Sequence, residues 1–142
     1  HMSSPAVEVR HWTRQEYESM AAAGIFHPEE RLELIGGEIL RMTPQGSEHA
    51  TAIRLAEEQL RTAFGLGFDV RVQMPLALAP DSAPEPDLAV VVGAPRDYRE
   101  AHPQSAVLIV EVSDATLSFD RERKARLLCR CRHSRLLDRK LN

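Results

Sequence analysis

Residues 85–113 read EPDLAVVVGAPRDYREAHPQSAVLIVEVS, and this stretch decides the fold. It contains two short continuous apolar runs, 88–92 and 107–112, joined by a linker rich in turn-forming residues. Apolar runs of this length are typical of strands that are buried on both faces of a sheet. An acid, Asp87, stands at the head of the first run, and Glu111 stands near the tail of the second. If the two strands pair antiparallel, these two acids meet at one end of the sheet.

Two converging carboxylates can bind a divalent metal ion and so activate a water molecule. Mg²⁺ and Mn²⁺ are the expected ions, because both prefer oxygen ligands. Lys124 follows thirteen residues after Glu111, on a stretch that predicts a helix from about Ser118. A lysine near the attacking water can orient it or offset negative charge on a phosphate. The two acids and the lysine together predict a metal-dependent nuclease.

These residues also have purely structural interpretations. Asp120 and Lys124 are four residues apart on the predicted helix, where an ion pair contributes about 0.3–0.5 kcal/mol. Asp87 could cap the loop that precedes its strand. Glu111 is harder to explain in this way, because an acid inside VLIVEV is costly to bury without a partner or a metal. Strand alternation places Ser113 on the same face as Glu111.

The N-terminal part of the chain predicts a helix and a hairpin. Thr13 and Glu16 have the spacing of a capping box, which begins a helix over about 14–23. In RLELIGGEILRM, residues 31–42, two short runs flank a Gly-Gly pair, which is typical of a β-hairpin.

The middle of the chain predicts a second helix and a further strand. Ser47 can cap a helix over about 48–64, and residues 69–78 resemble a long strand. Pro75 makes that strand an edge or bent strand. The resulting order, α-ββ-α-βββ-α, predicts an α/β (α+β) fold with a central mixed sheet flanked by helices.

Composition limits the class of protein. A length of 142 residues predicts one domain over 1–142, and 43% hydrophobic with 5% aromatic residues predicts an aliphatic core. No apolar run reaches the roughly 18 residues of a membrane span, and Cys129 and Cys131 make no disulfide framework. We therefore expect a cytoplasmic protein with no membrane partner.

Charge is distributed unevenly along the chain. Residues 121–142 contain nine Lys or Arg and two acids, whereas residues 1–120 contain nine Lys or Arg and nineteen acids. The basic end could contact phosphates or be a solvated tail. The acidic body argues against tight nonspecific binding to nucleic acid.

Four motifs in order resemble the Uma-type family of endonucleases, bacterial domains of the PD-(D/E)xK restriction-endonuclease-like superfamily. They are RLELIGGEI, PQGSEHA, EPDLAVV and LIVEVSDATLSFDRERKARL, and the resemblance runs from about Val9 to Leu127. It implies a restriction-endonuclease-like core, Mg²⁺- or Mn²⁺-dependent hydrolysis of DNA phosphodiester bonds, and a homodimer or higher homo-oligomer.

The resemblance also implies roles for individual residues. Asp87 and Glu111 match the family's metal-binding acids, and Glu33 matches an N-terminal acid that completes the site. Lys124 matches the catalytic lysine that this family places on the next helix. From the sequence alone, Glu33 would be a solvent-facing strand residue.

Three further residues are candidate accessory residues. Ser113 stands where superfamily members often carry the lysine, and His49 matches a histidine that recurs in the family. Asp120 precedes Lys124 by one helical turn. Without the resemblance, His49 would be an ordinary polar residue at a helix N-terminus.

The chain departs from the family pattern after Leu127, so we expect the domain to be truncated or altered from about residue 128. One hypothesis is a local change of reading frame. Another is a metal site at Cys129, Cys131 and His133, although this short spacing lacks a clear fourth ligand. A third is that the cysteines simply lie at the end of the last helix. The alternative to an active enzyme is a catalytically inactive nuclease-fold module that binds nucleic acid or a protein partner.

Overall fold

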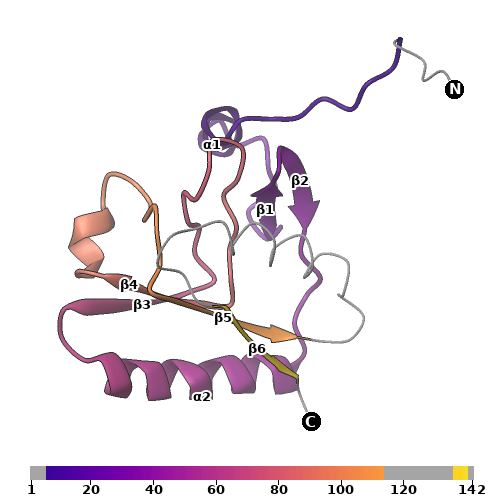
Figure 1. The fold of residues 1–142 in the computed structure, drawn as a ribbon. Helices are drawn as coiled ribbons and strands as arrows, with labels where there is room; N and C mark the ends of the chain where they lie inside the picture. Colours follow the sequence, from indigo (N-terminus) through magenta and orange to yellow (C-terminus); the bar gives the residue numbers. More distant parts are fainter. Residues whose placement is uncertain (1–5, 114–135, 141–142) are drawn as a thin grey trace, which may run out of the picture.

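The computed structural model describes residues 6–113 and 136–140, with backbone alone for Ser113 and the last five (Figure 1). In chain order the elements are α1 (Arg14–Ala22), β1 (Leu32–Ile35), β2 (Glu38–Arg41), α2 (Ser47–Phe64), β3 (Phe68–Val72), β4 (Leu88–Val92), the 3₁₀ helix η1 (Pro95–Tyr98), β5 (Leu108–Ser113) and β6 (Leu136–Lys140). None of the helices in these described residues is long and apolar enough to cross a membrane.

The strands form two sheets. Strands β1 and β2 make a two-stranded antiparallel hairpin, and the larger sheet has the order β3-β4-β5-β6. In the larger sheet β4 is antiparallel to both β3 and β5, whereas β6 is parallel to β5. The expected α/β fold with a central mixed sheet is therefore confirmed, with α2 packed against this sheet, and the helix predicted from about Ser118 lies outside the described residues.

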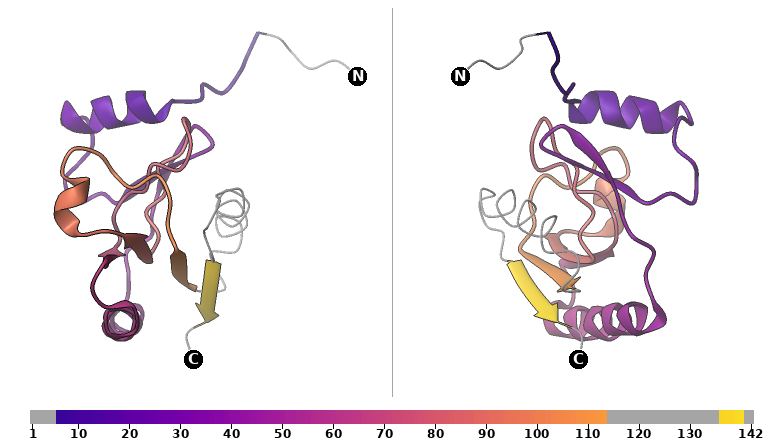
Figure 2. Two further views of the ribbon diagram at one scale, coloured as in Figure 1. Left: turned by 60° about the vertical axis from the view of Figure 1, so that its left-hand side comes forward. Right: turned by 90° about the vertical axis from the view of Figure 1, so that its right-hand side faces the viewer.

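Helix α2 covers one face of the larger sheet (Figures 1 and 2). Ile53 of this helix packs against alternate residues of three strands, and the core on this face is purely aliphatic apart from Phe64. Its buried members are Ile53, Val70, Leu88, Val90, Val110 and Val112. Since strand residues alternate between faces, Ile109 and Glu111 lie on the opposite face of β5.

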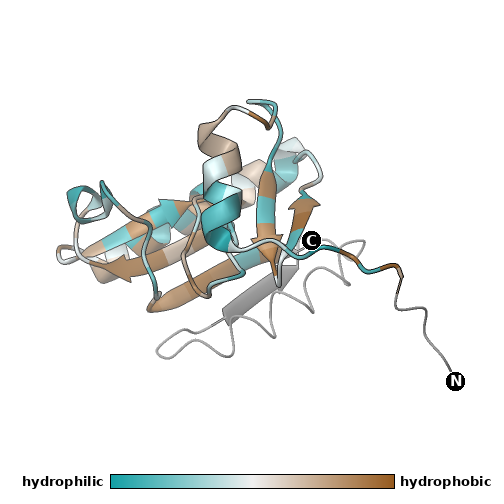
Figure 3. Ribbon diagram, turned by 90° about the horizontal axis from the view of Figure 1, so that it is seen from above, coloured by the Kyte–Doolittle hydropathy of each residue, from teal (hydrophilic) through white to brown (hydrophobic). Residues whose placement is uncertain are grey.

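That opposite face is covered by irregular segments. Leu76 and Ala106, from the connections on either side of β4, pack there against Ala89, Val91 and Ile109. Both β4 and β5 are thus buried on two faces, as their continuous apolar runs predict, and Figure 3 shows these strands as mostly hydrophobic segments.

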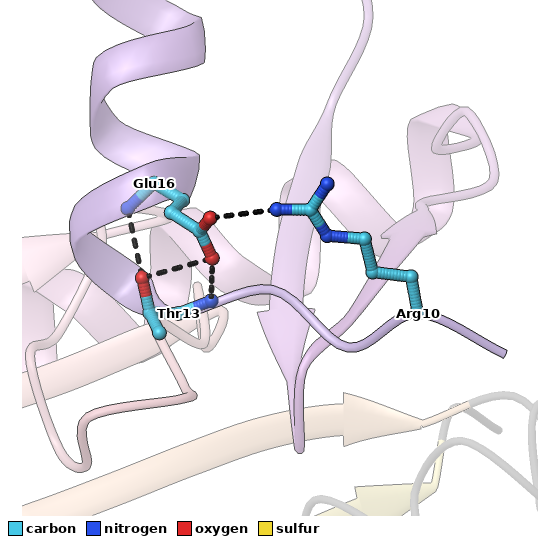
Figure 4. A network of polar contacts seen from close by, with 3 residues as sticks. All are labelled: Arg10, Thr13 and Glu16. Atoms are coloured by element: carbon cyan, nitrogen blue, oxygen red, sulfur yellow. Dashed lines mark hydrogen bonds and ion pairs between the residues drawn. The ribbon is translucent and has the colours of Figure 1, made fainter. Parts of the chain in front are cut away.

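Helix α1 and the hairpin form a third cluster, on the side of the molecule away from α2 (Figure 2). The predicted capping box is present: Thr13 Oγ1 accepts the Glu16 N–H at 3.0 Å, and a Glu16 carboxylate oxygen accepts the Thr13 N–H at 2.9 Å (Figure 4). Arg10 lies 2.9 Å from the other carboxylate oxygen. The predictions for α1 and the hairpin are confirmed.

Three details differ from the sequence predictions. Ser47 is the first residue of α2, and Gly46, in extended conformation, takes the cap position without a side-chain hydrogen bond. Strand β3 stops at Val72, because Gln73 adopts a positive φ of 51° and turns the chain well before residue 78. Strand β6 was not predicted as a strand.

Candidate active site

The two acids of residues 85–113 meet at one end of the larger sheet. Leu88 pairs with Val110, so continuing the antiparallel register by one residue places Asp87 opposite Glu111. The Val112 N–H donates a hydrogen bond of 2.8 Å to Asp87 Oδ2, which joins the head of β4 to the tail of β5. The predicted antiparallel pairing is confirmed, and we call this place, defined by Asp87 and Glu111, the acidic end of the sheet.

The backbone of Asp87 is held in place by the turn that follows β3. Asp87 is 7% exposed, and its carbonyl oxygen accepts the Gln73 N–H at 3.1 Å. Among the described residues, Gln73 is the non-glycine residue with a positive φ. This backbone conformation costs free energy in any residue other than glycine. Sequence reasoning missed Gln73 because glutamine carries no local preference for this conformation.

Helix α2 brings His49 to the acidic end. Its first turn lies beside the tail of β5 in Figure 1, and His49 Nε2 is 3.7 Å from Asp87 Oδ2. The His49 side chain is 16% exposed, so the contact is largely shielded from water. This distance is too long for a direct hydrogen bond, so the two groups interact through a water molecule, or by charge attraction when the imidazole is protonated. A carboxylate at this place is also favoured by the positive end of the helix dipole.

Glu33 is fully buried, so its interpretation as a solvent-facing strand residue is wrong. Its Oε1 accepts the Glu85 N–H at 2.9 Å, which ties β1 to the segment that leads into Asp87. Burial raises the pKa of Tyr17 to about 12, with smaller contributions from the carboxylates of Glu85 and Glu33. Glu33 therefore lies among α1, the hairpin and the residues just before β4.

Other predicted residues are placed only in part. Glu111 is partly buried on the sheet face opposite α2. Ser113 ends β5, and its backbone alone is described. Asp120 and Lys124 lie outside the described residues, as do Cys129, Cys131 and His133.

The chemistry of the donor set suits a hard divalent cation. Asp87 and Glu111 offer carboxylate oxygens from neighbouring strands, and oxygen is the ligand type that Mg²⁺ and Mn²⁺ prefer. Within residues 6–113, the side chains form no group of three or more His, Cys, Asp or Glu residues arranged to hold a metal ion. Asp87 and Glu111 thus fit as part of a ligand set rather than as a complete one.

Comparison with known proteins gives the wider context. A structural neighbour is described as a "putative nuclease belonging to DUF820" from Anabaena variabilis, with a TM-score of 0.64 and 14% identity, over 89% of this chain and 73% of that one. This likeness shows a shared fold. A search of curated proteins gave no match. The model of the family "Uma2: Putative restriction endonuclease" matches residues 14–133, so the chain belongs to the Uma2 family.

Proposed function

We propose that this protein is a divalent-metal-dependent endonuclease that hydrolyses DNA phosphodiester bonds. The observation that carries the proposal is the hydrogen bond from Val112 N–H to Asp87 Oδ2, which joins the strand head bearing Asp87 to the strand tail bearing Glu111. Membership of the family described as "Putative restriction endonuclease" supports the same reaction class.

In this proposal Asp87 and Glu111 would hold Mg²⁺ or Mn²⁺, and Glu33 would assist directly or through water. The bound ion would lower the pKa of a water molecule and neutralise charge on the phosphate. Lys124 orients the attacking water and offsets negative charge in the transition state.

The neighbours of Asp87 prepare its carboxylate for this role. The Val112 N–H and His49 both approach Oδ2, so one oxygen of the carboxylate is oriented by the protein. Such outer contacts fix a metal-binding side chain before the ion arrives, which reduces the ordering that accompanies binding. The Glu33–Glu85 hydrogen bond similarly fixes the segment that precedes Asp87.

An inactive module that binds nucleic acid or a protein partner is the second candidate. The observation in its favour is the acidic body of the chain, where residues 1–120 carry nineteen acids against nine Lys or Arg. Titration with Mn²⁺ separates the two candidates, because an inactive site of this kind would show no saturable binding that depends on Asp87.

The test is nicking of supercoiled plasmid DNA in Mg²⁺, Mn²⁺ or EDTA. We expect metal-dependent nicking in the wild type and its loss in Asp87→Asn, which retains an acceptor for the Val112 N–H but removes the charge. Lys124→Ala should lose nicking as well. Glu58→Gln, which removes an exposed acid on α2, is the matched control and should nick like the wild type.

Two results would refute the proposal. One is nicking that persists in EDTA. The other is equal nicking by the wild type and Asp87→Asn, with circular dichroism showing both folded.

A further inference from the structure

Strand β6 brings a second set of charged residues to the acidic end. It runs parallel to β5, so the tails of both strands lie at the same end of the sheet. In the register, Asp138 pairs with Glu111 and Lys140 pairs with Ser113. Asp138 and Lys140 therefore stand on the sheet face of Glu111, while Arg139, the partner of Val112, stands on the face that α2 covers.

Four elements thus converge at this end: the head of β4, the tails of β5 and β6, and the first turn of α2 (Figure 1). Asp87, Glu111 and Asp138 occupy neighbouring positions across three adjacent strands. Like charges at opposed positions of neighbouring strands are unfavourable, so this end of the sheet favours cations.

The acids that repel one another at this end also repel a DNA phosphate that approaches them. The first 120 residues carry nineteen acids against nine Lys or Arg, so most of the chain repels a polyanion. Lys140 belongs to the basic end of the sequence, and the β5–β6 register places it two positions along from the pair Glu111 and Asp138. A lysine at this register position would offset repulsion where the phosphate must come close to the acids.

We propose that Lys140, through its register position beside Ser113 at the tail of β6, contacts the phosphate backbone of DNA at the acidic end. This inference rests on the proposed function for its substrate class, but it can be measured without cleavage. It gives one residue of the basic end, Lys140, a place in substrate binding, as a cation additional to Lys124.

The experiment measures binding of a short DNA duplex in EDTA by fluorescence anisotropy, over a series of salt concentrations. Each phosphate contact contributes about 0.9 to the slope of log affinity against log salt. We expect Lys140→Gln to lower the slope by about that amount and to weaken binding severalfold at about 0.1 M salt. Lys140→Arg should restore the slope, because it keeps the charge.

Arg139→Gln is the matched control, since it removes the same charge from the adjacent residue on the other face. An unchanged slope in Arg139→Gln, with a lowered slope in Lys140→Gln, supports the proposal. Equal slopes in the two variants, or no binding by the wild type, would overturn it. If the wild type binds with the Lys140-dependent slope but never nicks DNA, the proposed endonuclease fails while the phosphate contact stands.

Discussion

Asp87 is the residue on which the site depends, and its surroundings explain why. Its backbone carbonyl is fixed by Gln73, and its carboxylate is approached by the Val112 N–H and by His49. These contacts come from β5, α2 and the turn after β3, so three elements orient one side chain. A substitution in any of them should therefore affect the site without touching Asp87 itself.

Replacing His49 by Ala should weaken Mn²⁺ binding by about tenfold, because outer-shell partners of metal ligands typically contribute 10–100-fold to affinity. Isothermal titration calorimetry measures this directly. Glu48→Gln, an exposed change in the same helical turn, should leave the affinity unchanged. An unaltered affinity in His49→Ala would show that the 3.7 Å contact with Asp87 does not position the carboxylate.

The capping box of α1 gives a pH prediction. Hydrogen bonding to the Thr13 backbone, helped by the Thr13 hydroxyl and Arg10, lowers the pKa of Glu16 in the folded protein (Figure 4). A lowered folded-state pKa stabilises the fold above the unfolded value of about 4.3, and the contribution is lost as pH falls through the folded value.

Urea unfolding at pH 6 and pH 3 tests this expectation. Glu16→Gln should be less stable than the wild type at pH 6, and the difference should shrink at pH 3. A difference that stays constant between the two pH values would contradict it.

At the scale of elements, the sequence correctly predicted the features that depend on residues close together in the chain. The capping box begins α1, and the Gly-Gly pair forms the β1–β2 turn, where Gly36 and Gly37 have positive φ values of 56° and 83°. The end of β3 was wrong because the backbone at Gln73 turns to donate to Asp87, which is a contact distant in sequence. A pattern over a few neighbouring residues cannot predict such a contact.

The hairpin turn yields a prediction about two neighbouring glycines. A Cβ on Gly36 meets nothing within 4 Å, so Gly36→Ala should cost only the left-handed backbone penalty, about 1–2 kcal/mol. A Cβ on Gly37 would lie 2.6 Å from His11 Cβ, and Gly37 also bonds through its backbone to Trp12 and Asp81. Gly37→Ala should therefore be clearly the more destabilising of the two.

Urea denaturation of the two variants measures that difference. Because β1 carries Glu33, which holds the Glu85 N–H, Gly37→Ala should also weaken Mn²⁺ binding more than Gly36→Ala does. Equal loss of stability in the two variants would mean that the segment around His11 can move away from residue 37 without a loss of free energy.

At the scale of the whole molecule, the sequence predicted the meeting of Asp87 and Glu111 because two buried apolar runs that follow one another in the chain can pair antiparallel. It could not predict that α2, some forty residues earlier, brings His49 to the same place, because helix position over a sheet depends on packing of residues such as Ile53. Nor could it place β6, whose register beside β5 depends on a pairing between segments separated by more than twenty residues.

The gathering of these elements predicts that metal binding stabilises the entire fold. Asp87 stands at the head of β4 and Glu111 lies in β5, so an ion bound by both acids is bound only by the folded chain. At a free concentration of 100 times the dissociation constant, such an ion adds about 2.7 kcal/mol to the free energy of unfolding. Mn²⁺ and Mg²⁺ are the proper probes, because a softer ion would also bind Cys129 and Cys131 in the unfolded chain.

Urea unfolding with saturating Mn²⁺, or with EDTA, measures this stabilisation. The wild type and Glu58→Gln should gain stability with Mn²⁺, whereas Asp87→Asn should gain none, because its amide is a poor ligand at this position. If the neutral variant is stabilised as much as the wild type, the ion binds elsewhere on the acidic surface, and Asp87 is then only the structural link between β4 and β5. If Mn²⁺ raises the free energy of unfolding only in chains that retain Asp87, the ion binds at the junction of β4 and β5.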